Sequence, residues 1–161
     1  MWFRISNVLA LFVLALVMLT GYLEIAVVKV TTPESYQIHS YGIWEGLEFE
    51  VPALSDWIGK VMTVVKIAFG IAFLIVVGVI LSGRRFTLQQ RLWEVLLIFE
   101  ILVMILTIWM LSELADELGG KIEFSLGAIL YIMVIAISVL GWRATLRDIL
   151  LYKRRKGRQV R

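Results

Sequence analysis

The sequence predicts a membrane protein of the all-α class: a four-transmembrane-helix bundle with a small antiparallel β-sheet in the first extracellular loop. Three observations predict it, namely the apolar composition, four long apolar runs, and the alternation of basic and acidic connections. The chain of 161 residues is 60% hydrophobic, whereas a soluble domain averages roughly 45–50% apolar residues. Four spans of about 20 residues each leave only loops and tails. We therefore expect residues 1–161 to form a single membrane domain with no separate soluble catalytic domain.

Each of the four apolar runs is long enough to cross a hydrocarbon core of about 30 Å. The expected spans cover about residues 5–28, 57–82, 92–111 and 122–142. The alternative for the first run is a cleaved signal peptide, whose apolar region would be about 7–15 residues long and followed by a site of small residues. The run here is longer, and the residues from Thr20 to Glu24 offer no such site. We therefore expect it to remain as a transmembrane helix.

The charge of the connecting segments alternates along the chain. Basic residues dominate the N-terminus at Arg4, the connection Gly83–Arg91 and the tail of residues 143–161, whereas the other two connections are mainly acidic. Basic segments stay on the cytoplasmic side of a membrane, and four spans place all three of them there. The pattern predicts a multi-pass protein of the cell membrane with cytoplasmic N- and C-termini. Tryptophans near the span ends fit interfacial anchors: Trp2, Trp57, Trp93, Trp109 and Trp142.

The first extracellular loop, residues 29–56, has the pattern of short strands. Apolar residues alternate with glutamates over residues 46–51, and a period of two indicates a half-buried strand. Pro33 follows a β-branched run and predicts a turn. We expect about three antiparallel strands, with a buried side formed by Trp44, Leu47, Phe49 and Val51. The other side would offer for contacts the acidic residues together with Tyr36 and Tyr41.

The third helix is predicted to continue beyond the membrane. Leu111, Leu114, Ala115 and Leu118 are spaced at i, i+3, i+4 and i+7, which places them on one face of a helix. The pair Gly119-Gly120 is a natural helix stop. We expect this extension to support the sheet from below.

The tetrapeptide Trp44-Glu45-Gly46-Leu47 precedes the second span. It stands where the claudin and peripheral-myelin-protein superfamily of tetraspan proteins has a Trp-x-Gly-Leu-Trp signature, and the layout of spans and loops resembles that superfamily over most of the chain. Glu48 stands in the place of the second Trp, and the paired cysteines of the family are absent because the chain has no cysteine. The resemblance implies a left-handed four-helix bundle topped by an outer sheet, here without the family's disulfide.

The resemblance also implies a function in lateral assembly, adhesion or assistance to a partner protein. We expect a claudin-like tetraspan protein whose outer sheet contacts neighbours in the same membrane or on an apposed cell, by self-association or by binding another membrane protein. Two alternatives are a cofactor-free accessory subunit of a larger membrane complex, and a small channel or transporter that uses Lys66 and Glu100.

Lys66 and Glu100 are the charged residues deepest in the expected spans. At 1.5 Å rise per residue, each lies about 12 Å from one end of its span, so antiparallel neighbouring helices would bring the two side chains close enough to pair. Charges inside a membrane are costly and are expected to be paired or to face a wet cavity. The interpretations are a structural ion pair, a Lys66 that snorkels to the interface beside a protonated Glu100, or a proton or ion relay.

Motifs for catalysis, metals or cofactors are absent from the sequence. His39 is the only histidine, so histidine clusters and paired haem ligands are excluded. A Gly-rich phosphate loop and a Ser-His-Asp arrangement are also missing. We therefore expect no enzyme activity and no cofactor or metal, and the chain carries no nucleic-acid-binding motif.

A basic run follows the fourth span. Near an anionic inner leaflet each of its residues would gain about 1 kcal/mol, and the same charges determine the orientation of the span. The expected contacts with anionic lipid are made by Lys153, Arg154, Arg155, Lys156 and Arg158.

Overall fold

The computed structural model describes residues 4–31, 36–44, 46–47, 56–83 and 85–159. Its helices are α1 (Ile5–Tyr22), α2 (Asp56–Leu81), α3 (Phe86–Leu118) and α4 (Leu126–Gln159). Its strands are β1 (Glu24–Thr31), β2 (Tyr36–Gly42), β3 (Gly46–Leu47) and β4 (Lys121–Phe124). Within this part of the chain, four helices are long and apolar enough to cross a membrane, in agreement with the four predicted spans.

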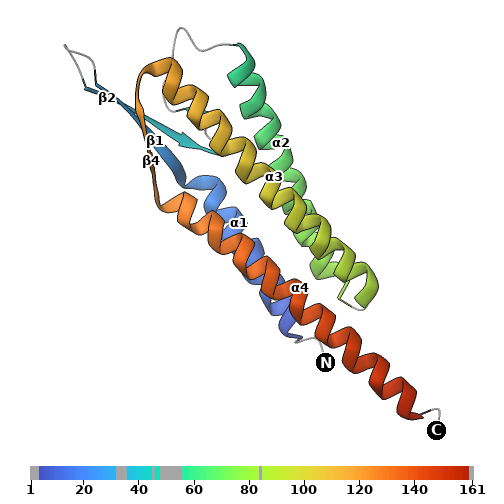
Figure 1. Ribbon diagram of the computed structural model, residues 1–161. Coiled ribbons are helices and arrows are strands. Elements are labelled where there is room, and N and C mark those ends of the chain that lie inside the picture. Colours follow the sequence, from blue (N-terminus) through green and yellow to red (C-terminus); the bar gives the residue numbers. More distant parts are fainter. Residues whose placement is uncertain (1–3, 32–35, 45, 48–55, 84, 160–161) are drawn as a thin grey trace.

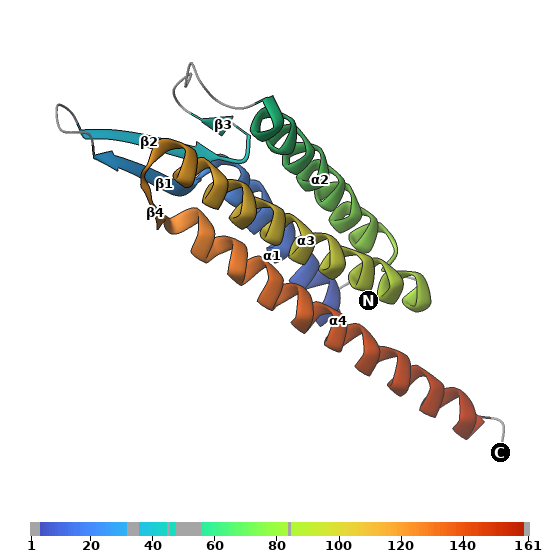
Figure 2. The same cartoon turned by 45° about the horizontal axis from the view of Figure 1, so that its top comes forward.

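The four helices form an elongated bundle with the sheet at one end (Figure 1). α1 packs against α2 and α4, and α3 packs against α2 and α4, so neighbours in the sequence are neighbours in the bundle and the ring closes between α1 and α4. We call the end that carries β1, β2 and β4 the sheet end. The other end, past which α4 continues, we call the tail end (Figure 2).

The first helix is shorter than the sequence predicted. α1 ends at Tyr22, and β1 begins at Glu24 after the single residue Leu23, so the expected span to Val28 was too long. Residues 25–30 are apolar or β-branched apart from Lys29, and such a run suits a buried strand as well as a helix. This run forms a strand because it pairs with β2 on one side and with β4 on the other.

The sheet contains a strand that the sequence analysis assigned to the fourth span. The strand order is β3-β2-β1-β4 and every pairing is antiparallel. The expected hairpin is present as β1 and β2, but β4 comes from the second loop. The prediction of a sheet built from the first loop alone was therefore incomplete, and the fourth helix starts at Leu126 rather than near Ile122.

β1 and β4 pair because the helices next to them in the sequence already lie side by side. α1 runs into β1 through Leu23, and β4 runs into α4 through Ser125. The Ser125 amide donates to the carbonyl of Ile25 at 2.9 Å, and the Ser125 hydroxyl donates to the carbonyl of Glu24. An ion pair between Lys29 and Glu123 joins the two strands further along. The sheet is thus tied directly to the α1–α4 contact.

The third helix continues beyond the apolar region and stops at the predicted glycine pair. Gly119 adopts the left-handed conformation with φ 61°, which a residue without Cβ enters at no steric cost. The Gly120 amide then donates to the carbonyl of Ala115 at 2.8 Å. Leu111 and Leu114 on this extension are fully buried. The expectation that the extension supports the sheet is consistent with the packing of α3 against β1 and β4.

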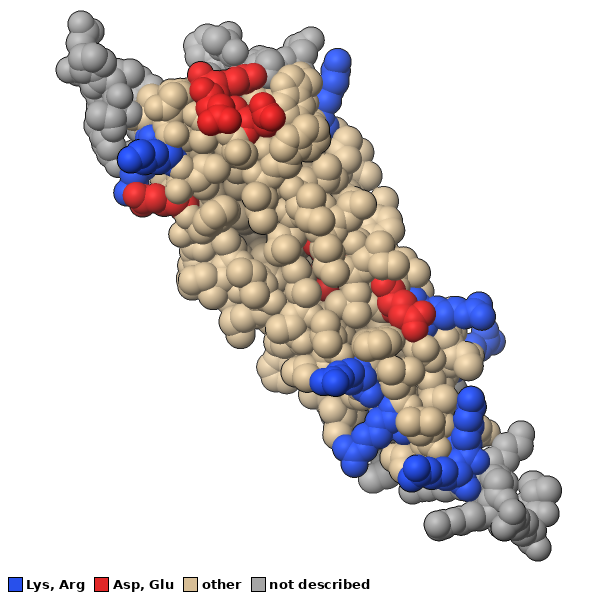
Figure 3. Space-filling model, viewed as in Figure 1, with Lys and Arg blue, Asp and Glu red and all other residues tan. Residues whose placement is uncertain are grey.

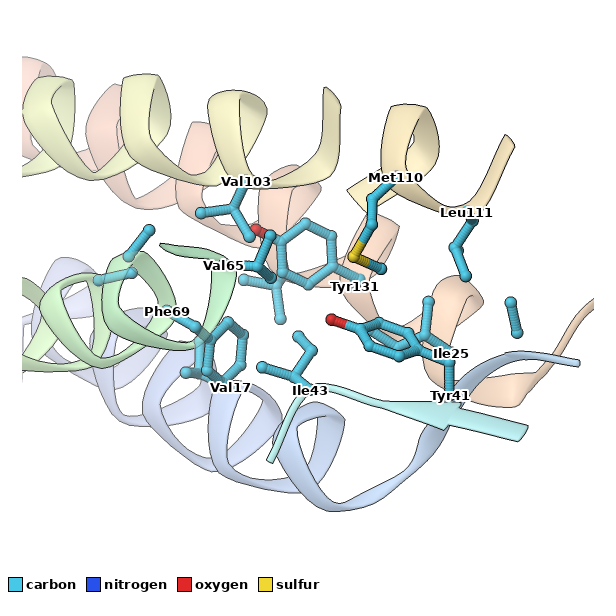
Figure 4. Close-up of a cluster of buried hydrophobic side chains, with 14 of the residues drawn as sticks. Val17, Ile25, Tyr41, Ile43, Val65, Phe69, Val103, Met110, Leu111 and Tyr131 are labelled. Atoms are coloured by element: carbon cyan, nitrogen blue, oxygen red, sulfur yellow. The ribbon is translucent and has the colours of Figure 1, made fainter. Parts of the chain in front are cut away.

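The core at the sheet end joins strands and helices in one apolar cluster. Tyr41 lies in β2 and Ile43 follows it, and both side chains project toward Phe69 of α2 and Tyr131 of α4 (Figure 4). The Tyr41 side chain is fully buried, so the prediction that it is available for contacts was wrong. Its hydroxyl has no hydrogen-bond partner among the described residues. Burial raises the pKa of the Tyr41 phenol, so the group stays neutral beneath the sheet.

Candidate functional site

Three regions carry the residues that the sequence analysis singled out: the Trp44 turn at the sheet end, the middle of the bundle, and the tail end. Figure 3 shows that acidic side chains gather at the sheet end while most basic side chains on this face lie toward the tail end. This separation follows the alternation of charge along the sequence. It leaves few charged side chains on this face in the middle of the bundle.

Trp44 fixes the turn after β2 onto the top of the bundle. Its amide donates to the carbonyl of Gly21 at 3.2 Å. Its ring meets Phe69 edge-on, with centroids 5.7 Å apart and planes at 78°, a favourable aromatic geometry. The indole also covers Gly21 so closely that a Cβ there would overlap it. The ring thus joins α1 and α2. Because 39% of Trp44 is still exposed, the residue also presents a face to the surroundings.

The rest of the predicted loop motif is described only in part. Gly46 and Leu47 form β3, which pairs with Gly42 and Tyr41 of β2. Glu45 and the expected buried residues Phe49 and Val51 lie outside the described residues, as does the side chain of Leu47. Of the side chains predicted to lie on the buried side of the sheet, only that of Trp44 is described, and it packs against Gly21 and Phe69 but stays partly exposed.

Glu100 lies in the middle of α3 and only 1% of it is exposed. The Ser138 hydroxyl on α4 donates to Glu100 Oε1 at 2.9 Å. The Tyr131 hydroxyl, also on α4, donates to the main-chain carbonyl of Glu100 at 2.9 Å. Glu100 Oε2 is buried and has no hydrogen-bond partner among the described residues. One neutral hydroxyl therefore bonds to the carboxyl group and a second bonds to the main chain of the same residue, and both join α3 to α4.

The predicted ion pair between Lys66 and Glu100, whose side chains are both described, is not formed. Among the described residues, the ion pair found is that of Lys29 with Glu123. Lys66 is half-buried on α2. The structure brings Glu100 to Ser138 and Tyr131 instead. Sequence reasoning missed both partners, although a serine and a tyrosine inside an apolar span are the polar groups able to meet a buried acid.

Near the tail end, a second set of polar side chains forms hydrogen bonds between helices. The Gln89 amide donates to the Asn7 side-chain oxygen at 2.8 Å, which links α3 to α1. Glu94 accepts from Gln90 at 2.8 Å and from the Trp142 indole at 3.2 Å. Glu94 thus bonds to neutral side chains.

The basic run of the tail lies on the last turns of α4, which extends to Gln159. Lys153 and Arg154 are exposed. The side chains of Arg155, Lys156 and Arg158 lie outside the described part of the chain. The helical tail therefore carries its described basic groups on an open surface.

The contact between Ser138 and Glu100 predicts a measurable effect on stability. Ser138→Ala removes a hydrogen bond between two helices, and such bonds in membrane proteins contribute about 0.6 kcal/mol on average and up to about 1.7. We expect a loss near the upper value because the carboxyl group then has no side-chain donor. The free energy of unfolding in mixed micelles, followed by circular dichroism, measures this loss.

Ser82→Ala is the matched control for Ser138→Ala. The Ser82 hydroxyl, directly after α2, is also buried but donates at 2.9 Å to the carbonyl of Val79 in the last turn of that helix, so its removal breaks no contact between helices. Equal losses for the two variants would contradict a specific role for the Ser138–Glu100 bond.

A comparison with protein-family models found no matching family, and a comparison with curated proteins found no similar sequence.

Proposed function

We propose that this protein is a claudin-like tetraspan protein of the cell membrane whose sheet end mediates lateral assembly or cell-surface contacts. The observation that carries the proposal is the sheet, which is built from both loops and is fastened to the bundle at several points. Trp44 fastens it to α1 and α2, and the Ser125 bonds tie the segment before α4 to β1. A surface held in this way keeps its shape when it meets a partner, which lowers the entropic cost of binding.

The free side of β4 is the part of the sheet best suited to a neighbour in the same membrane. β4 is the last strand in the order of the sheet, and an uncovered strand edge is a template for contact with another chain. Phe124, at its end, is 57% exposed. It stands next to the start of α4, where Leu126 and Ile129 are also exposed. The contact would therefore lie beside the membrane surface.

Cysteine cross-linking tests the lateral contact. The chain has no cysteine, so Phe124→Cys introduces a single thiol. We expect oxidation in native membranes to give a disulfide-linked dimer, because a contact through the free side of β4 brings two copies of residue 124 together. Dimer formation is read from non-reducing gels and from the mass of the protein in nanodiscs.

Tyr22→Cys is the control for the cross-linking experiment. Tyr22 is equally open to the surroundings and lies at the same end of the bundle, on α1. Equal cross-linking at both positions would reflect random collision. A monomeric mass with no dimer at position 124 would contradict self-assembly and would favour the alternative of an accessory subunit that needs a different partner.

A further inference from the structure

An apolar groove opens between α3 and α4 just below the sheet. Its volume is about 240 Å³, and its walls include Ile25, Ile43, Met104, Thr107, Ala128 and Tyr131. An apolar cavity of about 150 Å³ already stays dry and takes up apolar molecules. Ile108, Ile129 and Ile132 of its lining are exposed, so in a bilayer the groove would be open to apolar molecules dissolved among the acyl chains.

Glu100 does not line the groove itself, but it precedes Met104, which does, by four residues on α3. Tyr131 belongs to both places, since its ring lines the groove and its hydroxyl donates to the Glu100 carbonyl at 2.9 Å. On α3, Glu100, Met104 and Thr107 are spaced at i, i+4 and i+7 and therefore share one face. Met104 and Thr107 line the groove. The backbone of Glu100 thus lies about one helical turn, or about 5.4 Å, from that of Met104 along α3.

No cationic side chain in the described part of the chain forms an ion pair with Glu100. The polar groups that face it from α4 are Ser138 and Tyr131, both neutral hydroxyls. Lys66 of α2 makes no ion pair with it within the described residues. A buried carboxylate without a cation is far more costly than a neutral carboxylic acid. The arrangement therefore favours a bound proton.

We propose that Glu100 is a proton-binding site within the membrane and that apolar molecules reach its carboxyl group from the bilayer through the groove between α3 and α4. The proton would sit on Oε2, since Oε1 accepts from Ser138. Phe124 and Ile129 belong both to the groove and to the contact proposed for the sheet end, so the labelling is measured on the monomeric protein in nanodiscs.

A protonated carboxyl group of this kind reacts with an apolar carbodiimide. One oxygen of the Glu100 carboxyl group adds to the central carbon of dicyclohexylcarbodiimide, and the carboxyl proton moves to one of the two reagent nitrogens. The O-acylisourea that forms has no water or amine beside it in an apolar site. Its acyl group therefore shifts from oxygen to nitrogen and leaves a stable N-acylurea that contains all atoms of the reagent.

The labelling experiment uses the full-length protein in nanodiscs and intact mass spectrometry. We expect one dicyclohexylcarbodiimide to add to the unmodified protein, and we expect Glu100→Gln to lose this addition completely. Glu94→Gln, on the same helix, should keep it. A water-soluble carbodiimide should not label Glu100. Labelling by the water-soluble reagent, or labelling that survives in Glu100→Gln, would overturn the proposal.

The route through the groove is tested with a pair of matched variants. Ala128 lines the groove, whereas Ala136 is exposed two turns further along the same helix. Ala128→Trp should slow the labelling of Glu100 several-fold because the indole fills the groove, and Ala136→Trp should leave the rate unchanged. Equal rates would rule out this groove as the route.

Two further measurements decide what Glu100 binds. The infrared spectrum at neutral pH should contain a carbonyl band of a protonated carboxyl group that is absent from Glu100→Gln and present in Glu94→Gln. If this carbonyl band has the same intensity in the parent protein and in Glu100→Gln, Glu100 is ionised and the proposal is overturned. If sodium chloride protects Glu100 from labelling and choline chloride does not, Glu100 belongs to a cation site and the assignment to a proton is overturned.

Discussion

Replacing Trp93 with Ala is expected to reduce the free energy of unfolding by about 3–5 kcal/mol, the usual cost of removing a large buried aromatic side chain. None of Trp93 is exposed, although the sequence analysis placed it near a span end as an interfacial anchor. The ring lies directly against Gly141 of α4, where a Cβ would collide with it. The indole therefore fills the space between α3 and α4 that the glycine leaves open. Denaturation in mixed micelles measures the loss.

Two variants separate packing from other contributions of Trp93. The Trp93 Nε1 has no hydrogen-bond partner among the described residues, so Trp93→Phe loses no bond and should cost only a fraction of the loss for Ala. Trp109→Ala removes the same number of atoms from a tryptophan that is 51% exposed and contacts Trp57 at 5.4 Å between ring centroids. A loss for Trp109→Ala as large as that for Trp93→Ala would contradict the packing explanation.

Replacing Gly21 with Ala is expected to displace Trp44 and loosen the sheet from the bundle. The added methyl group would overlap the Trp44 indole and would lie 3.1 Å from Phe69. The indole already contacts Phe69, so it cannot move toward α2 without a second clash. Overpacking of this kind costs about 1–3 kcal/mol. We expect that loss together with faster proteolysis of the first loop, measured by limited digestion in nanodiscs.

Gly70→Ala is the matched control for Gly21→Ala. A Cβ at Gly70 would meet nothing within 4 Å, and Ala is favoured over Gly in a helix by about 1 kcal/mol, so this variant should be neutral or slightly stabilising. The double variant Gly21→Ala with Trp44→Ala should lose less than the sum of the single variants because the clash disappears. Strict additivity would mean that Gly21 and Trp44 do not interact.

Local patterns predicted much of the fold. The four spans, the hairpin of β1 and β2 and the extension of α3 up to Gly119 all follow from the length and period of apolar runs and from a glycine pair. Such features depend on residues near one another in the sequence, because apolar runs must leave water and a helix must stop where the backbone turns. Their ends were less well predicted, as α1 and α4 show.

Contacts between distant segments decided the remaining features. β4 is a strand because α1 and α4 are neighbours, which brings residues 121–124 beside β1. The partner of Glu100 is Ser138 rather than Lys66 because the α3–α4 contact sets the height and rotation of the two helices. Depth in the membrane can be read from a sequence, but the rotation of a helix about its own axis cannot.

The sequence by itself determined that four apolar helices carry a small β-structure at one end and basic residues at the other. Only the tertiary structure decided that Trp44 rests on Gly21, that Trp93 fills the space left by Gly141, and that Ser138 meets Glu100. The physical reason is that burial of apolar surface is roughly proportional to area and has no direction, whereas close packing and hydrogen bonds depend on which side chains meet.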